Sequence, residues 1–167
     1  YMHLLSGVDL QIKHSEEIFE FFDAHPDKQF IALRNPLSGI SGMNRYYYFL
    51  PLRAYNKYIA KGLDIISAFI QRKMKVNRLK DAKFVLCKSQ QWFSITKECA
   101  EYIVSQRSFI ENFIKYSCCS DEMVIGTVIA NSKFWEQVYE PYRSVGGHMR
   151  LIDRERAEKA SPHTFTM

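Results

Sequence analysis

Two adjacent carboxylic acids, Asp121 and Glu122, follow Ser120 at the predicted start of a helix. A helix start holds a side chain in a fixed position, which a general base requires. The same pattern also suits helix capping, because Ser120 is a favoured N-cap residue and acids stabilise the positive end of the helix dipole. Spacing alone favours capping, and composition does not choose between the two interpretations.

Other catalytic chemistries have less support in the sequence. The histidines are scattered, without metal-ligand spacing to each other or to a cysteine, and there is no Asp-x-Asp motif. Nor is there a glycine-rich phosphate loop of the Walker or Rossmann type. Cys118 and Cys119 precede a helix start, but no histidine is tied to them by sequence. We therefore expect no metal site, and we interpret the cysteine pair as inert.

The composition is that of an ordinary globular domain. The chain has 167 residues, of which 47% are hydrophobic and 25% are charged, so its length suits one domain. Aromatic residues make up 14%, which suits either an aromatic core or surfaces that bind flat ligands such as sugars. Four cysteines without a Cys-x-x-Cys pair favour a reducing compartment.

The formal net charge is +5, and much of the excess lies in residues 72–80, with Lys83 just beyond. A solvated helix end is the default interpretation of such a run. The alternatives are a phosphate-rich or membrane-facing role and, as a further hypothesis, nucleic-acid binding. No recognised nucleic-acid motif supports that hypothesis, so we expect no nucleic-acid partner.

Short strands mixed with helices predict an α/β fold without an internal domain boundary. Ser15 is expected to cap a short first helix, and Thr96 a later one that runs to about Gln106. Apolar residues at helical spacing predict a longer helix over residues 56–74. Further helices are expected over residues 109–116 and 120–131, and strands over residues 1–5, 29–33, 45–50, 84–86, 92–95 and 150–152.

Four blocks of sequence, in the right order, resemble the core-2/I-branching β-1,6-N-acetylglucosaminyltransferase family, which also contains the peptide O-xylosyltransferases. Residues 1–13 are similar to its early "hhLLSGxDhPhK" block, with Gln11 in place of proline. Residues 89–96 resemble its "GSQWFxLS" strand, with Ser89-Gln90 in place of Gly-Ser. Residues 119–132 resemble "xPDExxxxTxhxNS", with Ser120 in place of proline. Residues 148–153 and 161–164 resemble "LRYIDW…SPHT", with Arg154 in place of tryptophan.

The resemblance implies a GT-A-like α/β fold, with a mixed sheet flanked by helices. Residues 1–167 would form a single partial domain, incomplete at both ends. The resemblance also implies inverting transfer of a GlcNAc-type sugar from a UDP-sugar donor to a hydroxyl of a glycan acceptor, without a metal or other cofactor. On this interpretation Glu122 matches the general base, and Arg150 matches the arginine that contacts the donor diphosphate. Without the family match, Arg150 is interpreted as a surface arginine beside Asp153.

The other candidate site residues are less closely defined. Arg45, followed by three tyrosines, falls in the family's acceptor-binding stretch. Trp92 is interpreted as a core or site-wall ring, and Asp121 as a helix cap or a residue that orients its neighbours. Asp9 either contacts sugar or stabilises a turn. A catalytically inactive carbohydrate- or nucleotide-binding domain is the alternative to an enzyme.

The compact length and the absence of an Asn-x-Ser/Thr site favour a bacterial member of the family. A bacterial enzyme is expected in the cytoplasm, with peripheral contact at the inner face of the membrane. A eukaryotic enzyme would instead be expected in the Golgi lumen. By analogy with other bacterial enzymes, the acceptor is expected to be a surface polysaccharide.

Overall fold

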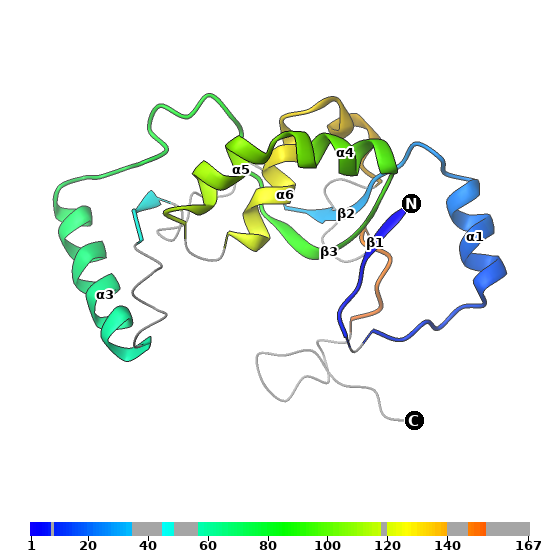
Figure 1. Ribbon diagram of the computed structural model, residues 1–167, viewed down its shortest axis with the longest axis horizontal. Helices are drawn as coiled ribbons and strands as arrows, with labels where there is room; N and C mark the ends of the chain where they lie inside the picture. Colours follow the sequence, from blue (N-terminus) through cyan, green and yellow to red (C-terminus); the bar gives the residue numbers. More distant parts are fainter. Residues whose placement is uncertain (8, 35–44, 49–56, 118–119, 140–146, 153–167) are drawn as a thin grey trace.

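The computed structural model describes residues 1–7, 9–34, 45–48, 57–117, 120–139 and 147–152. Its centre is a sheet of three antiparallel strands in the order β1-β3-β2, formed by Met2–Leu4, Ser89–Ile95 and Phe30–Leu33 (Figure 1). Within the described residues, parallel pairing occurs at the isolated bridge between Gln29 and Val138. The structure confirms the α/β class.

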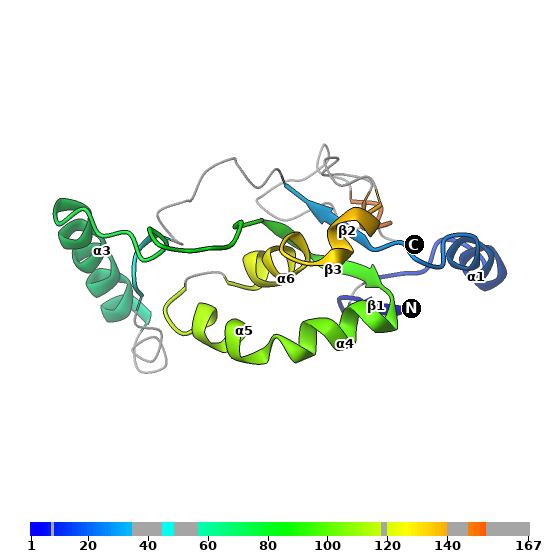
Figure 2. The same cartoon turned by 90° about the horizontal axis from the view of Figure 1, so that it is seen from above.

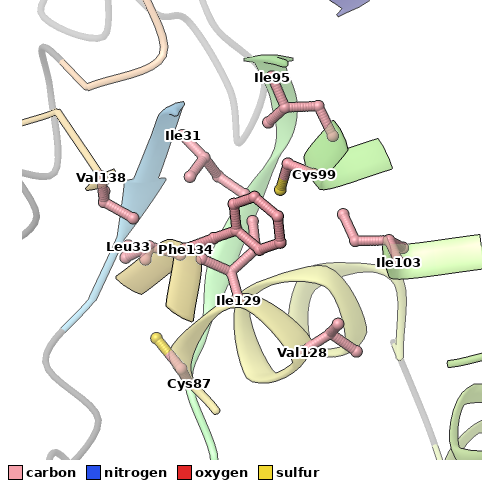
Figure 3. Packing of buried hydrophobic residues seen from close by; sticks show 10 residues of the cluster. All are labelled: Ile31, Leu33, Cys87, Ile95, Cys99, Ile103, Val128, Ile129, Phe134 and Val138. Carbon is pink, nitrogen blue, oxygen red and sulfur yellow. The ribbon is translucent and has the colours of Figure 1, made fainter. Parts of the chain in front are cut away.

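Helices α4, α5 and α6 lie on the same side of β3 (Figure 2). They span Lys97–Ser105, Arg107–Ile114 and Asp121–Ala130, and the 3-10 helix η2 follows at Lys133–Gln137. Thr96 caps α4 as predicted, because its hydroxyl accepts a hydrogen bond from the Cys99 backbone N–H. Residues from β2, β3 and these helices form the main core, which includes Ile31, Ile95, Cys99, Ile129 and Phe134 (Figure 3).

Helix α6 packs closely against the chain that leads into β3. A Cβ atom on Gly126 would lie 2.9 Å from both the Cys87 carbonyl oxygen and the Ser89 Cβ atom, so a larger residue would not fit. Thr127 is fully buried; its hydroxyl accepts from the Cys87 N–H at 3.1 Å and lies 3.3 Å from the Cys87 carbonyl oxygen, to which it donates. Polar side chains of α6 thus fix a backbone segment directly.

Asn131, at the end of α6, holds the backbone of Val85 in the same way. Its Oδ1 accepts from the Val85 N–H at 2.8 Å, and its Nδ2 donates to the Val85 carbonyl at 2.7 Å. These bonds use backbone groups that a neighbouring strand would otherwise pair. The strand predicted over residues 84–86 is therefore wrong: the segment belongs to no strand and is held by helix side chains.

A buried glutamine joins three distant parts of the chain. Gln29, just before β2, is fully buried. Its Nε2 donates to Thr96 Oγ1 at 3.0 Å and to Gln137 Oε1 at 3.2 Å, while its Oε1 accepts from the Thr96 N–H at 3.0 Å. The Gln29 N–H also donates to the Gln137 carbonyl at 2.8 Å. The beginning of β2 is thereby fixed to the start of α4 and the end of η2.

Helices α1 and α3 lie at opposite ends of the molecule (Figure 1). Helix α1 spans Ser15–Asp23 and has His14, rather than the predicted Ser15, at its N-cap. It packs on the sheet through aromatic rings, with Phe22 centred 5.1 Å from Phe30. Helix α3 spans Lys57–Lys73 and confirms the helix predicted over residues 56–74. None of the described helices has the length and apolar character needed to cross a membrane.

Three further predictions need correction. Helix α5 begins at Arg107 instead of Phe109 and ends at Ile114. Residues 45–48 form no strand, because the Gln71 side chain bonds both backbone groups of Tyr47, at 2.9 and 3.0 Å. The rest of that predicted strand, residues 49–50, lies outside the described residues. Residues 150–152 form no strand either, because the Arg150 N–H donates locally to His148 Nδ1 at 3.0 Å.

Candidate active site

Glu122 lies in the first turn of α6 and forms an ion pair with Lys88, the residue just before β3. The Lys88 Nζ atom lies 2.5 Å from Glu122 Oε2, and the two side chains are 41% and 44% exposed. The pair is therefore reachable from solvent. The ammonium group pairs with the ionised carboxylate, which is the form that can accept a proton.

The backbone around this pair is held firmly on both sides. The Lys88 carbonyl accepts from the Arg34 N–H at 2.8 Å, which ties it to the end of β2. On the other side, Thr127 binds Cys87, and Gly126 allows α6 to approach Ser89. The first turn of α6 and the start of β3 are thus fixed relative to each other, and Glu122 stands on a rigid frame.

Ser120 is the N-cap residue of α6, as predicted, but its side chain makes no capping hydrogen bond within the described residues. Asp121 instead accepts a hydrogen bond from the Gln91 side chain in β3. This contact is compatible with one of the two roles expected of Asp121, to orient its neighbours, and that role stays a prediction. Both acids still lie in the first turn, where the helix dipole favours negative charge.

A second polar cluster forms around Arg150. Its Nε lies 4.0 Å from Asp9 Oδ2, and its Nη1 donates to the His148 carbonyl at 3.0 Å. Burial lowers the pKa of Arg150, while the Asp9 carboxylate raises it. The buried Nε atom has no hydrogen-bond partner among the described residues, so one donor of the guanidinium is unused. Among the described residues, Asp9 is the acid beside Arg150. The neighbour expected from the sequence, Asp153, lies outside the described residues.

Asp9 stabilises a turn, as one of its two interpretations predicted. Its two carboxylate oxygens accept from the Ser6 backbone N–H and from the Ser6 hydroxyl, each at 2.8 Å. The Asp9 N–H donates back to the Ser6 carbonyl at 3.2 Å. This turn places the carboxylate beside Arg150, so the turn and the ion pair share one residue.

Trp92 forms part of this second cluster and is half-buried. Its ring lies 6.1 Å from that of His148, at an angle of 68°. His148 is almost fully buried; burial and, secondarily, the Arg150 charge lower its pKa. His148 Nδ1 accepts a hydrogen bond from the Arg150 N–H at 3.0 Å, which disfavours a proton on that nitrogen. Sequence reasoning missed His148, because a lone histidine gives no spacing signal.

The structure separates the predicted site residues into two groups. Gln91 bonds Asp121 at the start of α6, whereas Trp92 contacts His148. The Glu122 and Arg150 clusters therefore contact different residues of β3. Arg45 joins neither cluster within the described contacts. Its carbonyl accepts from the Arg78 N–H at 3.0 Å, on the side of the molecule that carries α3.

The remaining chemical groups give no second candidate within the described residues. Among the described residues, no group of three or more histidine, cysteine, aspartate or glutamate side chains could hold a metal ion. Metal independence stays a prediction. Cys87 and Cys99 are free and buried, and burial raises their pKa values to about 11 and about 12. Cys118 and Cys119 lie outside this part of the chain.

Comparison with known families identifies the class of protein. The profile of the Core-2/I-Branching enzyme family matches residues 1–166, and the chain belongs to this family. The family consists of glycosyltransferases, so the protein is an enzyme that uses a sugar donor and an acceptor. No curated protein and no solved structure matches the chain significantly.

Proposed function

We propose that this glycosyltransferase transfers a GlcNAc-type sugar from a UDP-sugar to a hydroxyl of a glycan acceptor, with inversion and without a divalent metal. The observation that carries the proposal is the Lys88–Glu122 pair on the rigid frame of α6 and β3. Glu122 is accessible, fixed and paired as a carboxylate. These are the properties that a general base needs.

In the proposed step, the acceptor oxygen attacks the anomeric carbon of the donor sugar. The new carbon–oxygen bond forms as the bond to UDP breaks, and Glu122 takes the proton from the acceptor hydroxyl. One proton acceptor is enough, because inversion needs no glycosyl-enzyme intermediate. General-base assistance contributes about 10²–10⁴-fold to the rate of such a step.

The departing UDP carries negative charge, which fixed cationic groups can stabilise. Arg150 is the proposed partner of the diphosphate, because its guanidinium is mostly buried and keeps an unused Nε donor. Lys88 is a second cation beside the proposed base. The roles of Glu122 and Arg150 are separate parts of the proposal, since the two side chains belong to different polar clusters.

Replacing Glu122 with glutamine tests the proposal. We expect Glu122→Gln to reduce UDP release from UDP-GlcNAc in the presence of acceptor by about 10²-fold or more. The thermal unfolding midpoint should stay near that of the wild type, because the Glu122 side chain is 44% exposed. EDTA should leave the wild-type rate unchanged.

Two controls make the result specific. Glu136→Gln makes the same chemical change at an exposed position in η2 and should keep full activity. Asp121→Asn should keep more activity than Glu122→Gln, because Asp121 bonds Gln91 instead of serving as the base. Wild-type activity in Glu122→Gln would refute the assignment of the base. A wild-type protein that binds UDP-GlcNAc without any turnover would favour the inactive binding domain.

A further inference from the structure

Helix α3 is amphipathic, but its polar side faces the protein. Ala60 is buried, and Gln71 lies against the Tyr47 backbone, with hydrogen bonds of 2.9 and 3.0 Å to its N–H and carbonyl. Gln71 also donates to the Ser67 hydroxyl at 2.9 Å. A surface helix of a globular protein normally turns its apolar stripe inward. In α3 the inner contacts are small and polar instead.

The apolar side of α3 faces outward. Six large apolar side chains on or just after the helix are each at least 58% exposed: Tyr58, Ile59, Ile65, Ile66, Phe69 and Met74. With successive residues 100° apart, they spread over roughly half of the helix circumference. Figures 1 and 2 both show α3 at one end of the molecule, away from the sheet. An exposed apolar surface of this kind marks a site of contact with a partner or a membrane.

Positive charge surrounds this apolar side. Lys61, Arg72, Lys73 and Lys75 are all exposed, and the last turn of α3 contains two of them. The Lys73 Nζ lies 5.7 Å from the centre of the Phe69 ring, so a positive charge lies against the apolar side at the last turn of the helix. Asp64 is the one acid in the α3 sequence and is half-buried.

We propose that α3 lies on the surface of an anionic lipid bilayer. Its aromatic and aliphatic side chains would enter the boundary between headgroups and acyl chains, and the surrounding lysine and arginine side chains would contact anionic headgroups. A broad apolar side with basic residues beside it is the pattern of helices that lie in the plane of the interface. Each basic residue near such a surface adds to the attraction, which salt weakens. Three residues of the basic run found in the sequence, Arg72, Lys73 and Lys75, thus serve the same contact, whereas Arg78 packs against Phe113.

Vesicle co-sedimentation of the full chain tests this proposal. We expect the wild type to sediment with vesicles of phosphatidylcholine and phosphatidylglycerol, less with phosphatidylcholine alone, and less as salt rises. Ile66→Glu and Phe69→Glu should each lose most of the bound fraction, because they place an anion on the apolar side. Phe19→Glu is the matched control, since Phe19 is 70% exposed on α1, and it should bind like the wild type.

Thermal unfolding and analytical ultracentrifugation test the two alternatives to a membrane: that the apolar side of α3 packs within the chain, or that it forms a dimer. The two α3 variants should unfold near the wild-type temperature, as expected of exposed positions. A large loss of stability in both would mean that the apolar side packs within the chain, and it would overturn the proposal. Absence of vesicle binding, or a dimer that Phe69→Glu dissociates, would overturn it too.

Discussion

The buried hydroxyl of Thr127 allows a quantitative test of the frame beneath Glu122. Valine has nearly the same shape as threonine, so Thr127→Val removes two hydrogen bonds to the Cys87 backbone, at 3.1 and 3.3 Å, without opening a cavity. Thr127 is fully buried, so water cannot take the place of its hydroxyl. A buried backbone donor left without a partner costs about 1–3 kcal/mol. We expect the free energy of unfolding to fall by that amount.

Urea unfolding followed by circular dichroism measures this change directly. For a chain of this size, the loss corresponds to a fall in the thermal midpoint of about 2–12 °C. Ser108→Ala, which removes a hydroxyl at an exposed position on α5, should leave stability unchanged. If Thr127→Val were as stable as the wild type, the side-chain bonds from α6 would not hold the segment before β3, and our account of the frame would fail.

Two further predictions follow from buried titratable groups. Burial raises the thiol pKa values of Cys87 and Cys99 to about 11 and about 12, so both should resist a disulfide reagent at about pH 8 until the protein unfolds. Mass spectrometry distinguishes their labelling from that of Cys118 and Cys119. Rapid labelling of Cys87 or Cys99 in the folded protein would contradict this prediction. Burial lowers the pKa of His148, so the unfolded chain binds more protons below its ordinary pKa of about 6.5, and stability should fall as pH drops through that value. His148→Gln should flatten this dependence, and an equal slope in the variant would assign it to another group.

Local sequence signals predicted the elements whose cause is local. Thr96 gives an N-cap signal that works within one turn, and α4 begins where it predicts. The apolar run after Glu122 likewise predicted α6. The tyrosine run after Arg45 also looked like a strand, but Gln71 of α3 takes the Tyr47 backbone groups. Long-range side-chain bonds of this kind leave no periodic pattern in the sequence.

In the candidate site, too, the sequence pointed to single residues, whereas their pairing became visible only in the structure. The family resemblance pointed to Glu122, Arg150 and Asp9 from short blocks of sequence. The pairing of Glu122 with Lys88, and of Arg150 with Asp9, joins residues far apart in the chain, so it depends on the sheet register and helix packing. His148 became visible only through its burial and its contact with Trp92.

The network around Gln29 has a consequence for the order in which the chain can fold. During synthesis Gln29 emerges early, whereas its partners Thr96 and Gln137 emerge much later. Until Gln137 is available, burial of the Gln29 amide would leave hydrogen-bonding groups unpaired, at a cost of about 1–3 kcal/mol. Contacts between residues this distant in sequence also form slowly. We therefore expect a nascent chain that stops before η2 to keep β2 exposed and to depend on chaperones until its last contacts arrive.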